Sequence, residues 1–573
     1  MNSIQGAGKK MVRMDRIDQD SGRRTQDAES YTHHPRWSLS TSTLLQIVLF
    51  AGIFVLNFFQ GTDVDMWWHL ATGRYIVETG VIPQTDPFSY TAAGQPWVAH
   101  EWLAEIGMFL LYRSGGYLAM VVCFASLITL TYWLALRTLR TLGIGLPASV
   151  CITFWIAFMS MAGWHVRPQA FSYLFFSFFL YLLIRARSHN DRRLWLLPLT
   201  MVVWVNLHGG YIMGLILVGL FITGEGINRL RESRGKGGAE RGNDGETRRG
   251  RNFLSAQHPA PNTQDAGLRA RDSALPYRRL IAIAGATILA AVANPQGISM
   301  LLYPFTYAGT QNASMKFITE WQSPNFHHYF FFVFGASMMV LMIAPSRKPV
   351  DWGLCIPLLA LTAMSLQSVR VIPFYAIVAA PVLGLRLAPP KLDIQNPEPK
   401  TQNQTQHSDQ DAGPRTQDSG LRPRHSTPLN WLLLAVCLAA MFSTLLLTDR
   451  AQLGPEPRMG DFPTQGAQYI KDSGLQGNIF NTFHWGGYLI WFFYPERPVF
   501  VDGRPDMYGD PFMEKYRKIH DARPGWEQVL NEYQVDIALV EKDGRVATLL
   551  AASDEWEEVF RGEIELVFVR KAT

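Results

Sequence analysis

Long apolar windows recur along the chain between positions 43 and 447, separated by shorter polar segments. Their lengths are near the ~17–25 residues that an α-helix needs to cross roughly 30 Å of hydrocarbon. The pattern predicts a polytopic α-helical membrane protein with about eleven spanning helices, and an odd number places the two termini on opposite sides. The predicted spans are 43–60, 117–136, 145–164, 169–187, 193–207, 210–229, 280–298, 329–345, 352–367, 371–387 and 430–447.

Basic clusters provide an independent check, because all of them fall on one side of the predicted membrane. They lie in the N-terminal tail, at Arg137 and Arg140, at 185–193, through 229–279, at 346–349 and around 386–425. Loops rich in Lys and Arg usually face the cytoplasm. We therefore expect a multi-pass protein of the cytoplasmic (inner) membrane, with a cytoplasmic N-terminus and an external or periplasmic C-terminal region. These loops also explain the net charge of +5, so no nucleic-acid partner is implied.

The polar stretches define the expected domains. Residues 1–40 form a cytoplasmic disordered tail without the apolar core of a signal peptide, so the first helix is expected to remain attached. The transmembrane domain, 41–448, contains an external loop at 61–116, in which 100–113 has the pattern of an amphipathic helix lying in the interface. Within it, two segments are too polar to bury a core and are expected to be disordered cytoplasmic loops, namely 231–276 and 389–427.

The C-terminal region, 449–573, is expected to be an external soluble α/β domain. Short β-prone runs alternate there with helical patterns. The expected strands are 477–483, 497–504, 535–542 and 565–571, and the expected helices are 463–474 and 524–533. The four cysteines all lie in apolar segments, so no disulfide framework or Cys-based metal site is predicted; they are Cys123, Cys151, Cys355 and Cys437.

Polar residues that are hard to explain as packing gather on the predicted external side. Ionisable groups near the hydrocarbon boundary are costly and often mark substrate or ion sites. The candidates are Asp63, Asp65, His69, His100, Glu101, His165, Arg167, Asn206, His208, Glu320 and Arg370.

Simpler interpretations of these residues stay open. Asp is a favoured helix N-cap, so the two aspartates could cap the next helix. Trp67 and Trp68 have the position of interfacial anchors. The polar groups at 165–167 and 206–208 could be ordinary inter-helix hydrogen-bonding groups.

Four stretches resemble, in the same order, the motifs of one enzyme family. They are DMWWH (65–69), ITEWQSP (318–324), QSVRVIPFYAIVAAP (367–381) and FHWGGYLIWFFYPERPVFVDGRPD (483–506). They are similar to the D-P-Y-Y-H pattern after the first helix, the external-loop Glu motif, the Val-Arg helix and the Trp-Trp-Asp-Tyr-Gly block of oligosaccharyltransferase catalytic subunits. The resemblance implies a membrane glycosyltransferase of the C-type (GT-C) fold.

The resemblance also implies roles for the acidic residues. Asp65 matches the catalytic carboxylate, with Asp63 beside it, and Glu320 matches a second carboxylate that meets the acceptor or a metal. A carboxylate can accept the acceptor's proton or hold a cation. A divalent cation, Mg²⁺ or Mn²⁺, would be held by Asp65 and Glu320.

A second group of residues is implied in substrate binding. Arg370 matches a contact to the lipid-linked phosphate of the donor, and we place Arg167 and His165 with it. A guanidinium fork binds such an anion bidentately and stabilises its developing charge. The acceptor-binding residues implied by the C-terminal block are His484, Trp485 and Tyr488.

Two departures from the family pattern affect the acceptor and the metal. Trp485 stands where the family block has an Asp, so the residues that read an Asn-X-Ser/Thr acceptor are not recognisable. In the second external loop, 164–168 offers an imidazole and a guanidinium where the family commonly has an acidic pair. The nature of the acceptor and the need for a metal are therefore left open.

The expected function is transfer of a sugar or oligosaccharide from a polyprenyl phosphate or diphosphate carrier to a protein, lipid or polysaccharide on the external face. One alternative keeps the fold and makes the acceptor lipid A or a cell-wall polymer. Another is a non-catalytic transport or assembly protein. Transporters commonly show internal repeats, which the spans lack, and no phosphate loop for ATP is present.

Overall fold

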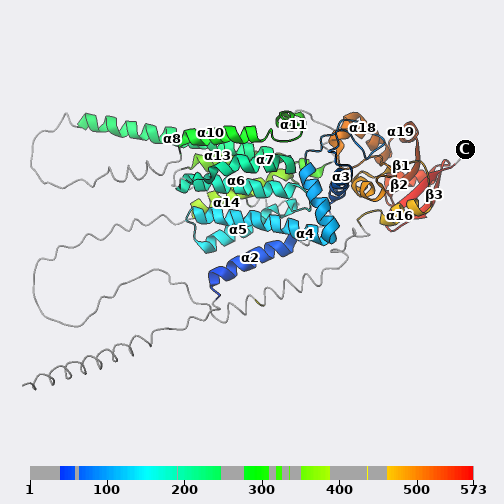
Figure 1. Cartoon of the computed structure of the whole chain (residues 1–573), viewed down its shortest axis with the longest axis horizontal. Helices are drawn as coiled ribbons and strands as arrows, with labels where there is room; N and C mark the ends of the chain where they lie inside the picture. Colours follow the sequence, from blue (N-terminus) through cyan, green and yellow to red (C-terminus); the bar gives the residue numbers. More distant parts are fainter. Residues whose placement is uncertain are drawn as a thin grey trace, which may run out of the picture. The chain divides into compact units, whose positions relative to one another are not determined.

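The computed structural model describes residues 39–57, 63–189, 191–246, 276–308, 318–325, 350–387 and 461–571, with the single positions 335 and 435. The chain divides into two compact units, Met1–Gln46 with Gln402–Ala439 and Ile47–Thr401 with Ala440–Thr573. The described part of the first unit is residues 39–46 and 435. The site described below belongs to the second unit. Figure 1 labels the helices and strands along the chain.

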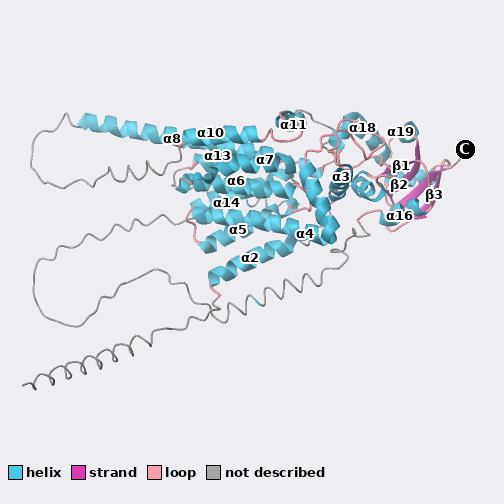
Figure 2. Cartoon of the chain, in the orientation of Figure 1, coloured by secondary structure: helices cyan, strands magenta, loops and turns pink. Residues whose placement is uncertain are grey.

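The apolar part of the chain is helical (Figure 2). Helices that coincide with predicted spans are α2 (Thr41–Asn57), α4 (Trp102–Thr141), α5 (Leu146–Ser160), α6 (Gln169–His189), α7 (Leu196–Leu207), α8 (Tyr211–Glu246), α10 (Tyr277–Ala290), α13 (Trp352–Gln367) and α14 (Ile372–Leu387).

Four helical stretches among the described residues are long and apolar enough to cross a membrane. They are Trp102–Thr141, Gln169–His189, Tyr211–Arg234 and Val369–Leu387. The predicted spans 329–345 and 430–447 lie outside the described residues apart from positions 335 and 435. The total of about eleven therefore stays a prediction.

The predicted interfacial helix at 100–113 and the next span both lie within α4. The helix is interrupted at Gly115 and Gly116, and Gly116 has a φ of 62°, which a residue with a side chain rarely adopts. The amphipathic and apolar segments are thus two helices joined at a glycine pair.

One predicted loop is partly helical. Helix α8 continues to Glu246 and takes in the first part of the loop expected at 231–276. Residues 231–246 include five glycines, which are poor helix formers, so propensity does not explain the extension. Extending an existing helix does avoid the cost of nucleation. The rest of that loop, the loop at 389–427 and the tail before residue 39 lie outside the described residues.

The loop at 61–116, predicted to be external, contains a helix that the apolar pattern did not predict, α3 (Met66–Thr79). It lies against α4 because Gly73 has no side chain: a Cβ there would lie 2.1 Å from the backbone oxygen of Glu105. Trp67 of α3 is 1% exposed and packs edge-on against Tyr488 at 5.6 Å between ring centroids. Trp67 is therefore a core residue rather than an interfacial anchor.

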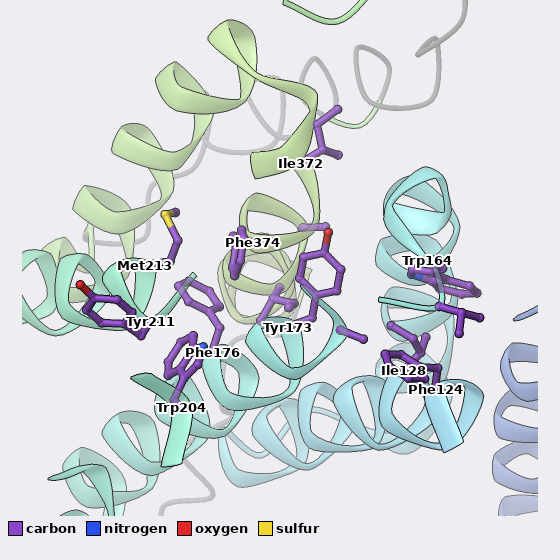
Figure 3. Close-up of a cluster of buried hydrophobic side chains, with 14 of the residues drawn as sticks. Phe124, Ile128, Trp164, Tyr173, Phe176, Trp204, Tyr211, Met213, Ile372 and Phe374 are labelled. Carbon is purple, nitrogen blue, oxygen red and sulfur yellow. The ribbon is translucent and has the colours of Figure 1, made fainter. Parts of the chain in front are cut away.

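Aromatic side chains form the core between the long helices (Figure 3). Phe374 of α14 packs against Tyr173 and Phe176 of α6, with ring centroids 5.2 and 4.9 Å apart. Phe179, one turn further along α6, packs against Trp204 of α7 at 5.2 Å. Edge-to-face aromatic pairs contribute about 0.5–1.5 kcal/mol each beyond the burial of their area. These contacts position the helix ends that carry the site.

The C-terminal domain is α/β, with one sheet of strand order β1-β2-β4-β3. Strand β1 is parallel to β2, and the other neighbours are antiparallel, with Ile537 opposite Val569. The elements are α16 (Thr464–Asp472), β1 (Asn478–Asn481), α17 (Gly486–Phe493), α18 (Pro505–His520), α19 (Trp526–Glu532), β2 (Val535–Glu541), α20 (Arg545–Ala552), β3 (Trp556–Arg561) and β4 (Glu565–Arg570).

The expected strand at 497–504 is wrong. This segment is extended, but its one described bridge joins Val499 to Ser89 of the external loop. The side chain of Asn481 takes the place of a strand ladder, since its Oδ1 accepts from Phe500 N and its Nδ2 donates to Val501 O. Strand β3 was not predicted. The other expected strands and both expected helices coincide with β1, β2, β4, α16 and α19.

Ion pairs with carboxylates lie at both ends of α6. The first turn of the helix follows Arg167, whose contacts are described below. Near its last turn, Arg187 pairs with Glu225 of α8 at 3.0 Å and with Asp351, the N-cap of α13, at 2.9 Å. The second end also carries the basic residues at 185–193, which by the positive-inside rule favours the cytoplasm for that end.

We expect alkaline phosphatase fused after Thr573 to be active, because that enzyme matures only outside the cytoplasm. Green fluorescent protein fused before Met1 should fluoresce, because it folds only inside. Cell-surface and lysate assays of both fusions measure this. Fluorescence from a fluorescent protein fused after Thr573 would invert the orientation.

Candidate active site

Arg167 is at the centre of a cluster of charged side chains. Its Nη1 donates to Asp65 Oδ2 at 2.9 Å, its Nη2 donates to Glu320 Oε1, and its Nε lies 3.4 Å from Asp63 Oδ2. The Arg167 side chain is 7% exposed, whereas Asp65 and Glu320 are 22% and 25% exposed. One buried guanidinium therefore joins three carboxylates, of which Asp65 and Glu320 are partly exposed and Asp63 is buried.

Two further cations contact the same carboxylates. Arg370 Nε lies 3.3 Å from Glu320 Oε2, and its guanidinium lies over the ring of Trp321 at 5.0 Å. His165 Nδ1 lies 3.5 Å from Asp63 Oδ2, and its Nε2 lies 3.9 Å from Glu320 Oε1. The structure thus brings together the predicted residues at 63, 65, 165, 167, 320 and 370.

The corner before α6 places Arg167 at the cluster. Pro168 precedes the helix, and Ala170 N donates to Arg167 O at 3.2 Å, so Arg167 lies at the helix N-terminus. Gly163 lets this corner approach α14, because a Cβ there would lie 2.9 Å from Pro373 Cγ. The small residue therefore brings the corner close to the helix that follows Arg370.

Short backbone contacts hold Glu320 beside Arg370. Both residues lie in single 3₁₀ turns, η4 (Thr319–Trp321) and η5 (Val369–Val371). The two turns are joined because Ser368 Oγ donates to Glu320 O at 2.9 Å and Val369 N donates to Gln322 O at 3.2 Å. The pairing of the two side chains is thus supported by the backbone of both segments.

Asp65 occupies the N-cap position of α3 but makes no capping hydrogen bond with its side chain. Its Oδ1 accepts from Trp68 Nε1 at 3.3 Å, and its own N donates to Asp63 Oδ1 at 2.8 Å. Gly503 of the C-terminal domain lies against it, since a Cβ there would be 2.4 Å from Asp65 Oδ1. The helix-cap interpretation of Asp65 therefore has no support from its contacts.

The two central carboxylates have opposite pKa shifts. Burial and the charge of Asp63 raise the pKa of Asp65 to about 6, against the lowering effect of Arg167. Burial alone would also raise the pKa of Glu320, but Arg167 and Arg370 lower it to about 2. Carboxylates whose pKa values are pushed apart are typical of sites where one group moves a proton and the other stays charged. Here Asp65 is the group suited to proton transfer.

The C-terminal domain contacts the loop at 61–116 through a buried ion network. Arg504 donates from Nε to Asp502 Oδ1 at 2.7 Å, and its Nη2 lies 2.9 Å from Asp86 Oδ1. Tyr508 Oη donates to Asp502 Oδ2 at 2.6 Å. The Arg504 guanidinium also lies 4.5 Å from the ring centre of Trp97. This network fixes the turn that carries Gly503 over Asp65.

Other predicted external residues form a second cluster. His69 contacts Glu101 and Glu105, and Glu101 also contacts His100 and His208 at 3.4 and 3.3 Å. Asn206 has a bridging role: its Oδ1 accepts from Trp102 Nε1, and its Nδ2 donates to Ala293 O. The inter-helix interpretation therefore describes Asn206 well.

The three residues implied in acceptor binding do not lie together on one surface. Trp485 is 1% exposed, and Tyr488 packs among the rings of Trp67 and Phe462. Trp485 is buried, and Tyr488 is 6% exposed because its ring fills the contact between α17 and α3, so neither ring faces solvent. His484 is 43% exposed and pairs with Glu541 at 3.0 Å. A role in acceptor contact is therefore compatible with the exposure of His484 alone.

Two solved structures align with most of the chain. The archaeal oligosaccharyltransferase AglB from Archaeoglobus fulgidus, in complex with an inhibitory peptide and a dolichol-phosphate, aligns with a TM-score of 0.46 and 11% identity over 87% of this chain and 69% of its own. ArnT from Cupriavidus metallidurans, bound to undecaprenyl phosphate, aligns with a TM-score of 0.45 and 14% identity. The alignment covers 92% of this chain and 98% of the ArnT chain.

Both are membrane glycosyltransferases of the GT-C fold. This is the class named by the motif resemblance. No protein-family model and no curated protein sequence matches the chain. Because both TM-scores are below 0.5, the roles of individual residues are argued from this chain's own contacts.

Sequence reasoning missed several residues around Asp65. Trp68 was considered only as an anchor, and Asp86, Gly503 and Arg504 were not candidates. The Asp-Gly pair at 502–503 was the available signal, since it marks a turn rather than a strand interior. The apolar alternation of the preceding residues nevertheless predicted a strand that included this turn.

Proposed function

We propose that this protein is a membrane glycosyltransferase that takes a sugar or oligosaccharide from a polyprenyl phosphate or diphosphate carrier. The observation that supports the proposal is the cluster in which Arg167 and Arg370 share Glu320 while Asp65, with a pKa near 6, stands beside them. The carrier is of the class that the two aligned proteins bind, but the proposal rests on the cluster.

The chemistry follows from the charges. The acceptor's oxygen or nitrogen attacks the anomeric carbon, and the bond from that carbon to the phosphate oxygen breaks. Its electron pair leaves with the phosphate, and Asp65 takes the acceptor's proton. The developing negative charge is stabilised by fixed cations that need no reorganisation during the reaction.

Arg370 is better placed than Arg167 to bind the donor phosphate. Arg167 contacts all three carboxylates, Asp63, Asp65 and Glu320, and is 7% exposed. Arg370 contacts Glu320 alone among these carboxylates and is 26% exposed. We assign phosphate binding to Arg370, assisted by His165, and positioning of Asp65 and Glu320 to Arg167.

We propose that no divalent cation is needed between Asp65 and Glu320. One oxygen of each carboxylate already accepts from a terminal nitrogen of Arg167. A guanidinium there supplies the positive charge that a metal would bring. We therefore propose that the transfer step uses Arg167 and Arg370 and derive no step through a metal.

The acceptor is proposed only by class. It lies on the external face and is a protein, a lipid such as lipid A, or a wall polysaccharide. His484 is the predicted acceptor contact whose exposure is compatible with that role. Identification of glycans lost from a deletion strain by mass spectrometry would establish the sugar and the acceptor together.

Binding of the carrier tests the proposal directly. Full-length protein in detergent should bind undecaprenyl phosphate in native mass spectrometry, and Arg370→Gln should weaken that binding by about tenfold or more. A hydrogen bond to a charged group contributes about 1.5–3 kcal/mol, and 1.4 kcal/mol corresponds to a factor of ten.

Arg187→Gln is the matched control, because Arg187 is 21% exposed and paired with two carboxylates at the opposite end of α6. It should leave binding unchanged. Undecaprenol, which has the same chain without the phosphate, should bind the wild type and Arg370→Gln equally. If undecaprenyl phosphate binds no better than undecaprenol, the proposed donor is wrong.

A further inference from the structure

Three buried side chains from two helices converge near the proposed active site. His69 Nδ1 of α3 lies 3.1 Å from Glu105 Oε1 of α4 and 3.4 Å from Glu101 Oε2, at the N-cap of α4. The three ligand atoms all lie within 4.8 Å of one another. The three side chains are exposed by less than a tenth.

The sequence explains this convergence. Glu101 and Glu105 are four residues apart at the start of α4, so both carboxylates lie on the same face. His69 and Gly73 are likewise four residues apart on α3. Because Gly73 touches the backbone of Glu105, His69 is held one turn away, opposite both carboxylates.

The protein alone does not satisfy this cluster. Two carboxylates face one imidazole nitrogen, and Glu105 Oε2 is buried with no hydrogen-bond partner in the described part of the chain. A buried carboxylate oxygen without a partner is costly. A cation between the three side chains would remove that cost.

We propose that His69, Glu101 and Glu105 form a site for a divalent transition-metal ion of the Zn²⁺ class. Zinc binds nitrogen and oxygen ligands at about 2.0–2.2 Å, so ligand atoms at tetrahedral positions are about 3.3 Å apart. The distances of 3.1 and 3.4 Å from His69 Nδ1 match two of the three edges, and the third, between the two carboxylate oxygens, is at most 4.8 Å. Imidazole with carboxylates favours zinc over magnesium, which prefers oxygen and water.

A second layer of hydrogen bonds supports Glu101. His208 Nδ1 accepts from Gly210 N at 2.9 Å, so the neutral ring carries its proton on Nε2, which lies 3.3 Å from Glu101 Oε1. Glu101 can therefore receive a hydrogen bond on one oxygen and bind a metal with Oε2. Ligating carboxylates are commonly held in this way.

The site would act on positioning rather than on the reacting atoms. His69 lies one helical turn after Asp65, and His69 N donates to Asp65 O at 3.3 Å. A metal that joins α3 to α4 would fix the helix whose first residues carry the proposed base. We therefore assign the metal a structural role.

Metal loading of tag-free, full-length protein in detergent tests this assignment. After treatment with a chelator and reloading, the wild type should hold about one equivalent of zinc by elemental mass spectrometry. Cobalt loading should give the visible absorption of tetrahedral Co²⁺. Zinc should restore the melting temperature that the chelator lowers.

Glu105→Gln and His69→Gln should each weaken zinc binding by at least ~100-fold, since each removes a ligand. Glu225→Gln is the matched control, a carboxylate paired with Arg187 at the opposite end of α6, and should bind zinc like the wild type. Equal zinc binding by Glu105→Gln and Glu225→Gln would overturn the site.

The wild-type measurements decide the question even if a ligand variant fails to fold. A Co²⁺ spectrum that equals that of the aqueous ion would overturn the assignment without any variant. Neither readout depends on sugar transfer, so the carrier-binding experiment and the metal experiment can fail independently of each other.

Discussion

Asp65→Asn should lower sugar transfer by about 10²–10⁴-fold, the range that a positioned general base supplies. The change keeps the shape of the side chain and removes the proton acceptor beside Arg167. Transfer from a polyprenyl-linked sugar by purified protein measures the effect. Binding of undecaprenyl phosphate should persist, because Arg370 is unchanged. An Asp65→Asn protein with normal transfer would remove Asp65 from the mechanism.

Folding should tolerate this substitution. Burial and Asp63 raise the pKa of Asp65 to about 6, so the folded protein holds more protons than the unfolded chain between the ordinary pKa and about pH 6. Stability therefore falls as the pH rises through that window. Above pH 6 the ionised carboxylate disfavours folding. The Asp65→Asn protein should therefore have a melting temperature equal to or above that of the wild type.

The pH dependence of transfer gives a second readout of the same base. The kcat/KM of the wild type should fall as the pH drops below about 6, where Asp65 takes up its proton. Asp63→Asn removes a charge that raises the pKa of Asp65, so the acid limb should move to lower pH. A limb that stays in place in Asp63→Asn would contradict the proposed coupling.

Arg504→Met should lower the free energy of unfolding by about 3–5 kcal/mol, the range seen when one partner of a buried ion pair is removed. Arg504 is 2% exposed and lies between Asp502 and Asp86, so its loss leaves two buried carboxylates without their cation. Thermal unfolding of full-length protein, followed by tryptophan fluorescence, measures the change.

Arg523→Met is the matched control for that experiment. Arg523 pairs with Glu514 and Asp521 but is 39% exposed, and exposed pairs contribute about 0–1 kcal/mol. Arg504→Met with Asp86→Asn should be less destabilised than the sum of the two single variants, because the second change removes one of the unpaired charges. Equal melting temperatures for Arg504→Met and Arg523→Met would show that the buried ion network does not stabilise the fold more than an exposed ion pair.

Charged residues at the ends of apolar segments were the informative part of the sequence. Asp65, Arg167, Glu320 and Arg370 stood out because ionisable groups at a hydrocarbon boundary are costly and therefore rarely accidental. Their common side followed from counting spans. Their mutual contacts did not, because Arg167 meets Glu320 across 153 positions of chain, and such a pairing depends on how the helices pack.

Local patterns failed where side chains replaced backbone pairing. The segment 497–504 alternates like a strand, yet Asn481 binds its backbone through a side chain. Trp485 and Tyr488 matched a binding motif, but a motif does not show which way a ring points, and both rings are buried. The short helix α3 was not predicted because its two tryptophans resemble the anchors that are common at membrane interfaces.

The position of Gly503 against Asp65 has a consequence for biosynthesis. The ribosome has already delivered the acidic and basic side chains of the cluster when residue 370 is made, but the turn that covers Asp65 follows only with residues 502–504. Domains fold largely in the order of synthesis. The charged cluster of residues 63–370 can therefore form before the turn that covers Asp65 exists, and the proposed site is closed only after the C-terminal domain has been made and has folded.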